Sequence, residues 1–363
     1  MTADANHSSE HHEPGPGLNW GLVIVTYNRQ SVLPRAVRHA ATQNPPPSEI
    51  VIVDASDDWQ ETKAVVEEVV EQAGITPRFV YEAAEIRSIS TQRNQAIKRA
   101  EADILFMIDD DSLMFPGCAS EVMNIFNHPD AGEVVAMTTA LANAAPTGNE
   151  DPVPPPAPKQ IASTPRKPGV KRRVIEWMRG EYMPVYDTPP PTWNVPDALK
   201  TQFGCFERRQ LHGARMIIRR AALTDEPFDE TLNRYSYLED SDIGYRIGRK
   251  GIILAAPRAK ICHLADLSGR IPSKRTALIS VTNAVYLTRR NAAKPNRNIR
   301  TIQKNALKRI PLELARDWAA RRWSAPRARG IFAGLVHSRW IVNTPLSQIE
   351  QRYASFQEKL LDR

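Results

Sequence analysis

Residues 104–112 read ILFMIDDDS, five apolar residues followed directly by three carboxylates and a serine. A short apolar run of this kind predicts a strand that is buried on both faces. Three adjacent acids repel one another and resist burial, so a positive group is expected close to them. The stretch therefore predicts a buried strand that delivers Asp109, Asp110 and Asp111 to a site with a positive partner.

The sequence before this run alternates between strand and helix patterns. Strands are predicted at 20–27, 49–54, 76–81 and 103–108, and helices at 31–43, 58–73 and 88–100. This order predicts parallel strands joined by right-handed crossovers, that is, an α/β fold with a doubly wound, mostly parallel sheet and flanking helices. Ligands of such sheets bind outside the carboxyl ends of the strands. Asp54, at the end of the second strand, should therefore share one rim with the acids at 109–111.

Proline interrupts this pattern from about residue 144 to 196. At this density proline disfavours helix and central strand, so we predict a long surface excursion with one short helix at 174–180. Beyond it we predict a strand turning into a helix at 213–223, a helix at 238–248, and strands at 252–255 and 260–263. A helix is predicted at 273–290. The basic segment after it is predicted to be helical and to be broken into pieces by Pro295, Pro311, Pro326 and Pro345.

The composition is that of an ordinary globular protein, with 42% hydrophobic and 25% charged residues among 363. We see no apolar run of about 18 residues that would span a bilayer and no secretory signal pattern, which predicts a cytoplasmic location. Three widely spaced cysteines without C-x-x-C spacing favour buried thiols over a disulfide framework or zinc site. We expect a disordered arm at 1–17, a catalytic domain at 18–270 and a basic helical extension at 271–363.

Positive charge is concentrated in this extension. Residues 271–363 hold 19 Lys and Arg against 5 Asp and Glu, a net charge of +14, whereas residues 1–270 carry −7. One interpretation is solvated helix faces that cover the sheet. The other is peripheral contact with anionic membrane, with Trp318, Trp323 and Trp340 among the arginines. Nucleic acid is not an expected partner, because no motif for reading it accompanies the charge.

The acids at 109–111 suit a hard divalent cation. A D-x-D pair at a strand end lets alternate carboxylates converge on one ion and leaves positions for the phosphates of a ligand. The alternative is that the acids only cap the element that follows. Two registers remain open for the metal, Asp109 with Asp111 or Asp110 with Asp111. His263, after the predicted strand that ends in ICH, is either a sheet-edge residue or a nitrogen ligand for the same ion.

Two further groups of polar residues have both a structural and a functional interpretation. Glu239 and Asp240 begin a predicted helix, where the macrodipole stabilises acids, but one of them could also be a general base. Arg87, Arg93 and Asn94 lie in RSISTQRNQAIKRA, where they form either the polar face of a helix or a cationic contact for a diphosphate.

Taken in order, these segments resemble the family 2 glycosyltransferases of the GT-A fold. The resemblance covers roughly residues 18–290, and its specificity comes from the ordered series, since D-x-D alone is common. The matching segments are VIVTYNR at 23–29, IVIVDASDD at 50–58, STQRNQAI at 90–97, FMIDDDS at 106–112, GARMIIRRAAL at 213–223, the acidic helix within 228–251 and ICH at 261–263. Of these, GARMIIRRAAL resembles the acceptor-side segment of the family.

The resemblance implies an inverting enzyme that moves a sugar from a nucleotide sugar, a UDP-sugar by default, to a hydroxyl group. The implied acceptor is a surface glycan or a lipid-linked precursor. Roles for individual residues follow from it: Asp54, Thr26, Tyr27 and Asn28 at the nucleoside, Arg87, Arg93, Asn94, Asp109 and Asp110 near the donor, Asp109, Asp111 and His263 at Mg²⁺ or Mn²⁺, and Asp240 as the base with Glu239 beside it.

The chain departs from the family pattern at two places. Ser56, Asp57 and Asp58 follow Asp54 where a Gly-Ser turn is usual, and Gln95 stands where Gly is common. A nucleotidyltransferase is an alternative, although the chain lacks a Gly-rich basic loop after the first strand. A non-catalytic nucleotide-sugar-binding protein of the same fold is another, against which the acids at 109, 111 and 240 argue.

Overall fold

The computed structural model describes residues 17–146, 183–187, 191–224, 227–264 and 272–361. The helix predicted at 174–180 and, apart from Gly17, the arm predicted at 1–17 lie outside these ranges. The strands are β1 (Trp20–Thr26), β2 (Glu49–Asp54), β3 (Arg78–Ala83), β4 (Ile104–Ile108), β5 (Ser112–Met114), β6 (Val134–Ala142), β7 (Phe206–Glu207), β8 (Arg215–Arg219) and β9 (Ile252–His263).

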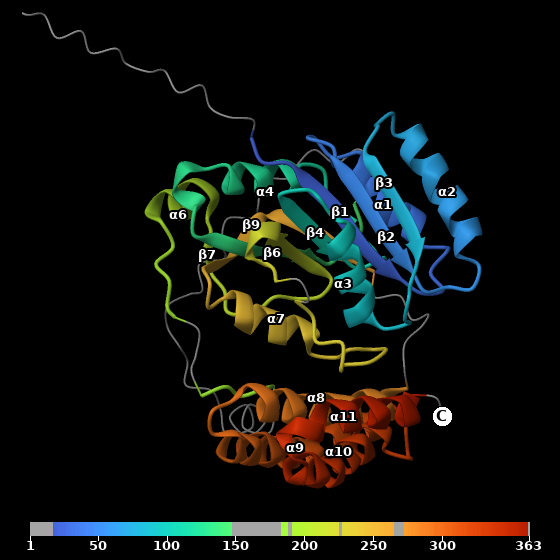
Figure 1. The fold of residues 1–363 in the computed structure, drawn as a ribbon, viewed down its shortest axis with the longest axis vertical. Helices are drawn as coiled ribbons and strands as arrows, with labels where there is room; N and C mark the ends of the chain where they lie inside the picture. Colours follow the sequence, from blue (N-terminus) through green and yellow to red (C-terminus); the bar gives the residue numbers. More distant parts are fainter. Residues whose placement is uncertain (1–16, 147–182, 188–190, 225–226, 265–271, 362–363) are drawn as a thin grey trace, which may run out of the picture.

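These strands form one sheet in the order β3-β2-β1-β4-β8-β6-β9-β5, with β7 paired to β9 (Figure 1). Strands β3, β2, β1 and β4 are parallel, as predicted, whereas β8 runs antiparallel to both β4 and β6. The predicted α/β architecture is confirmed, but the sheet is mixed rather than mostly parallel, because four of its eight described pairings are antiparallel. The register pairs Thr26 with Asp54, so the ends of β1 and β2 reach the same rim.

Helices cover the sheet and form a separate layer at the C-terminal end (Figure 1). They are α1 (Leu33–Ala41), α2 (Trp59–Gln72), α3 (Ile89–Arg99), α4 (Cys118–Phe126), α6 (Asp197–Phe203), α7 (Glu239–Ile247), α8 (Ser273–Asn291), α9 (Pro295–Ala319), α10 (Pro326–Asn343) and α11 (Leu346–Leu361), with 3₁₀ turns η1 (Pro129–Ala131) and η2 (Arg220–Ala222). None of the described helices combines the length and apolarity that a membrane crossing requires.

The apolar runs in the central strands feed two cores. Alternate residues of a strand point to opposite faces, so Leu22 and Ile24 join one core while Val23 joins the other. Helices α1, α2 and α4 contribute to the first core, and α3 and α7 to the second. Covering both faces leaves the rim at the strand ends as the place where polar side chains can gather.

Three predicted elements differ in the structure. The strands predicted at 252–255 and 260–263 form the single strand β9, because residues 257–259 bulge out of its pairing with β6 and accommodate Pro257 there. The helix predicted after β8 is only the short turn η2. Pro311 does not break a helix but lies inside α9. It is exposed, and the carbonyl group that it leaves without a partner belongs to Leu307, which also faces solvent.

The C-terminal helices have cores of their own. Helix α8 packs against α9 and α10, and Tyr286 of α8 stacks on Tyr353 of α11 with ring centroids 4.3 Å apart. Trp340 packs on Tyr353, whereas Trp323 is 74% exposed. All three cysteines are free and buried, as predicted.

Close packing of α10 on α8 depends on two glycines. A Cβ at Gly334 would lie 2.8 Å from Cβ of Val281, and one at Gly330 would meet the carbonyl oxygen of Lys274. We expect Gly330→Ala to lower the free energy of unfolding by about 1 to 3 kcal/mol, the usual cost of overpacking. Urea denaturation measures this.

Gly132→Ala is the matched control, since nothing lies within 4 Å of a Cβ there and φ is −54°. Its stability should stay within about 0.5 kcal/mol of the wild type, as for an ordinary surface substitution. Equal stability of the two variants would contradict the close approach of the helices.

Candidate active site

A cavity of about 810 Å³ lies at the rim where β1 and β4 end and where β8, α3 and α7 begin. This volume is within the range of small-molecule sites. Its walls hold ten of the predicted site residues: Thr26, Tyr27, Arg87, Arg93, Asp109, Asp110, Asp111, Glu239, Asp240 and His263.

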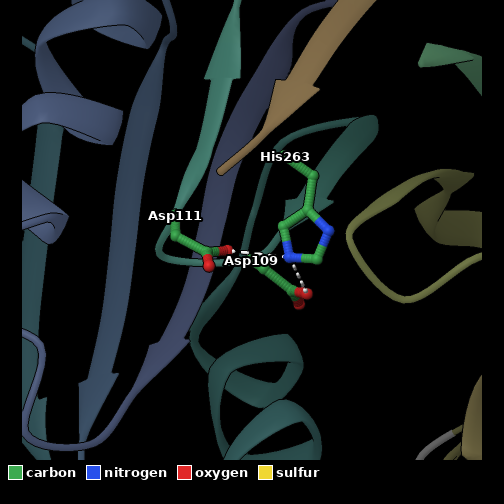
Figure 2. A group of neighbouring side chains, drawn as sticks. All are labelled: Asp109, Asp111 and His263. Atoms are coloured by element: carbon green, nitrogen blue, oxygen red, sulfur yellow. Dashed lines mark ion pairs between the residues drawn. The ribbon is translucent and has the colours of Figure 1, made fainter. Parts of the chain in front are cut away.

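Two of the acids after β4 converge with a histidine (Figure 2). Nε2 of His263 lies 3.0 Å from Oδ1 of Asp111 and 3.8 Å from Oδ2 of Asp109. Their candidate ligand atoms all lie within 4.8 Å of one another. The geometry follows from the sheet, because Ser112 of β5 pairs with His263 of β9 and so brings the two segments together.

The middle acid of the triplet points elsewhere. Asp110 accepts a hydrogen bond of 2.7 Å from Oγ1 of Thr26 at the end of β1. Of the two registers that the sequence leaves open, the structure thus brings Asp109 and Asp111 to His263. Burial raises the pKa of Asp110 to about 7, although the hydrogen bond from Thr26 opposes this rise.

The positive partners of these acids are arginines. Nη2 of Arg93, on α3, lies 3.4 Å from Oδ1 of Asp109, and its Nη1 lies 2.6 Å from Oε1 of Glu239. Nη1 of Arg29 lies 3.4 Å from Oδ2 of Asp111. The side chain of Arg93 is only 5% exposed, so water screens its attraction to these two acids only weakly.

The two acids at the start of α7 differ in their surroundings. Glu239 is held by Arg93, and burial followed by the charge of Asp240 raises the pKa of Glu239 to about 8. Asp240 has no ion-pair partner in the described part of the chain. Its Oδ2 accepts the N–H of Gly213 at 3.0 Å, and its Oδ1 accepts the N–H of Ser241 at 2.7 Å. Of the two, Asp240 is the carboxylate oriented without a cation.

The loop that leads into α7 has an unusual backbone. Arg234, Ser236 and Leu238 have φ values of 56°, 38° and 77°, in the left-handed region that residues other than glycine rarely adopt. Helix α8 holds this loop, because Nδ2 of Asn283 donates a 2.6 Å hydrogen bond to the carbonyl oxygen of Tyr237. The C-terminal helices therefore help to position the start of α7.

The nucleotide side of the predicted site is only partly at the cavity. The guanidinium carbon of Arg87 lies 3.3 Å from the centroid of the Tyr27 ring, and both residues line the cavity. Asp54 does not line it. Its carboxylate accepts hydrogen bonds from Oγ of Ser56 at 2.6 Å and from the hydroxyl of Tyr81 at 2.6 Å.

Asn28 and Asn94 are also absent from the cavity wall. Asn28 is exposed and its backbone N–H donates to Oγ of Ser56. Asn94 is fully buried, where its side chain accepts the N–H of Phe228 and donates to the carbonyl oxygen of the same residue. These hydrogen bonds of Asn94 fix the segment before the acidic helix, and its contact with the donor stays a prediction.

Several cavity residues were not predicted. Arg29 lies in the quoted VIVTYNR segment, so its charge was a usable signal. Gly213, His212 and Arg215 precede or begin β8. No local pattern connects them with Asp240, because the contact between Gly213 and Asp240 exists only in the folded chain.

Comparisons with known proteins agree with this geometry. The family model described as Glycosyl transferase family 2 matches residues 22–151. No curated protein sequence matches the chain. Among solved structures, GalNAc-T7 with UDP, GalNAc and Mn²⁺ is 13% identical, with a TM-score of 0.50 over 78% of this chain and 50% of that chain. TarS 1-349 of S. aureus with UDP-GlcNAc is 12% identical, with a TM-score of 0.50 over 95% of this chain and 92% of that chain.

This chain spans half the length of the GalNAc-T7 chain, and identities this low bear on the fold alone. The family match is independent of them and runs from β1 to beyond β6, which includes the acids that follow β4. Residues 22–151 therefore match the glycosyl transferase family 2 model, and the chain has the same fold, the GT-A fold, as these two glycosyltransferases.

Proposed function

We propose that this protein is an inverting, metal-dependent glycosyltransferase that moves a sugar from a nucleotide sugar to a hydroxyl group of an acceptor. The observation that carries this proposal is that Asp109, Asp111 and His263 share one cavity with the oriented carboxylate of Asp240. A UDP-sugar is the proposed donor. The similar structures of GalNAc-T7 and TarS contain UDP and UDP-GlcNAc, respectively, which supports this choice.

Asp109, Asp111 and His263 would hold Mn²⁺ or Mg²⁺. Two carboxylate oxygens and one imidazole nitrogen suit Mn²⁺, which accepts both kinds of donor atom. Such an ion, when bound, neutralises the charge that develops on the departing nucleoside diphosphate. Arg87, held over Tyr27 at the end of β1, lies where it can also contact a phosphate.

Asp240 is the proposed general base. It takes the proton of the acceptor hydroxyl as that oxygen attacks the anomeric carbon, and the N–H groups of Gly213 and Ser241 keep its carboxylate in position. Glu239 is a positioning residue, because its carboxylate is committed to Arg93. Single displacement with inversion needs only this base and a leaving group, so no protein nucleophile is required.

The cellular setting also remains a proposal. We propose that the enzyme acts in the cytoplasm in the assembly of a surface glycan or polysaccharide, with a glycan or lipid-linked acceptor. The basic extension at 271–363 is proposed to rest on anionic membrane. The exposed Trp323, which follows the exposed Arg321 and Arg322, supports this contact.

The first prediction concerns the base. We expect Asp240→Asn to lower kcat by about 10²-fold to 10⁴-fold, the usual contribution of a general base, while binding of the donor is retained. Transfer and hydrolysis should be measured with a panel of UDP-, dTDP- and GDP-sugars and Mn²⁺. Asp197→Asn, an exposed acid on α6, is the control and should turn over like the wild type. Wild-type rates for Asp240→Asn would exclude Asp240 as the base.

The second prediction concerns the metal register. Asp111→Asn should weaken Mn²⁺ binding by about tenfold or more, since even the outer partners of metal ligands are worth about 10-fold to 100-fold. Asp110→Asn should bind Mn²⁺ nearly as well as the wild type, because Asp110 is turned to Thr26. Calorimetric titration with Mn²⁺ distinguishes the two variants. An equal loss in both would mean that the metal is not held by Asp109, Asp111 and His263.

A further inference from the structure

The cavity has a second wall that the proposed donor site does not use. The segment from β7 to β8 carries Arg208, His212 and Arg215, here called the basic cluster, and the last two line the cavity. In the sheet order, β8 lies on the opposite side of β4 from β1. Arg215 pairs with Ile108, directly before the metal-site acids. The basic cluster therefore lies across these acids from the residues at the end of β1.

Arg215 is, like Arg87 at the end of β1, a cation at the cavity without an acidic partner among the described residues. Its guanidinium donates one hydrogen bond, to the carbonyl oxygen of Thr139 on β6, and no acidic group pairs with it among the described residues. By contrast, Arg93 is paired with Glu239, and Arg29 with Asp111. A guanidinium has five N–H donors in a planar fork that matches a carboxylate or a phosphate. A half-buried fork with one internal acceptor is therefore suited to an external anion.

Arg208 adds to the positive field around Arg215. Burial and then the nearby charge of Arg208 lower the pKa of Arg215, and burial followed by Arg215 lowers the pKa of His212. Burial is the larger cause of both shifts, and the crowding of positive charge is the smaller one. An anion bound among the three residues would relieve this crowding.

The basic cluster is also attached to the proposed base. Gly213 follows His212, and its N–H is the group that holds Oδ2 of Asp240. Asp240 in turn contributes to the electrostatic environment of His212. A ligand held by the basic cluster would thus lie beside the carboxylate that receives the proton of the acceptor.

We propose that the acceptor carries an anionic group, a phosphate or a carboxylate, which the basic cluster holds while Asp240 takes a proton from a hydroxyl group of the same molecule. This inference rests on the proposed function, and it names the chemical class of the acceptor. Arg215 supplies the bidentate contact, Arg208 supplies the surrounding positive field, and the neutral ring of His212 can donate a hydrogen bond. An anionic group on the donor sugar has the same chemistry, so the experiment separates the two sources.

The test uses the full chain with Mn²⁺ and acceptors matched in all but charge: glycerol 1-phosphate against glycerol, and methyl glucuronide against methyl glucoside. The wild type should favour a charged acceptor over its neutral partner by at least tenfold in kcat/KM. Arg215→Gln should abolish this preference by lowering kcat/KM for the charged acceptor to the level of its neutral partner. Arg215→Lys should restore part of it. Arg209→Gln is the control, because Arg209 is exposed and does not line the cavity.

A binding measurement without donor or metal separates this inference from the proposed function. Glycerol 1-phosphate, titrated by calorimetry, should bind the wild type and Arg209→Gln at least tenfold more tightly than Arg215→Gln. Equal affinity in all three overturns the inference. A preference that follows the charge of the donor sugar, UDP-glucuronate over UDP-glucose, with neutral and charged acceptors used equally, also overturns it. If no donor is consumed, the proposed function fails together with the acceptor assignment, whereas binding that depends on Arg215 would still establish the anion site.

Discussion

Mutual repulsion among five carboxylates at one rim is the constraint on which the rest of the site depends. Asp109, Asp110, Asp111, Glu239 and Asp240 all line the same cavity, and like charges this close in a partly dry place are costly. Arg93 offsets much of this electrostatic repulsion, because it reaches from α3 to Asp109 on one side and to Glu239 on the other. One buried guanidinium thereby links the acids after β4 to the start of α7, which carries the proposed base.

The C-terminal helices hold the loop that carries the proposed base into the site. The loop before α7 contains three non-glycine residues in the left-handed region, each of which costs on the order of 1 kcal/mol or more. Such a loop persists only when its surroundings hold it, and Asn283 on α8 does so at Tyr237. In addition, Tyr286 and Arg290 of α8 both bind Asp229, which lies before this loop in the chain. The extension is therefore part of the scaffold of Asp240, whatever its exposed basic faces contact.

The sequence predicts those parts of this arrangement that depend on local patterns of residues. Apolar runs such as ILFMI identify buried strands, and a parallel sheet then places the acids after them at one rim. The direction in which a side chain points cannot be predicted from the residues next to it in the sequence. Asp54 and Asn94 follow the family pattern, yet both turn toward internal partners, Tyr81 and Phe228. The ion pair between Arg93 and Glu239 joins residues 146 apart in the chain, so only the folded sheet brings them together.

The order of the strands also determines which side chains lie on each side of the acids that follow β4. Tyr27 and Arg87 lie at the end of β1, whereas Gly213, which holds Asp240, immediately precedes β8. Strand β4, with the acids that follow it, stands between β1 and β8. The proposed inversion by single displacement needs the attacking oxygen and the leaving group on opposite sides of the sugar, and the order β1-β4-β8 is compatible with that separation. A sugar between them would have its leaving phosphate toward β1 and its attacked face toward Asp240.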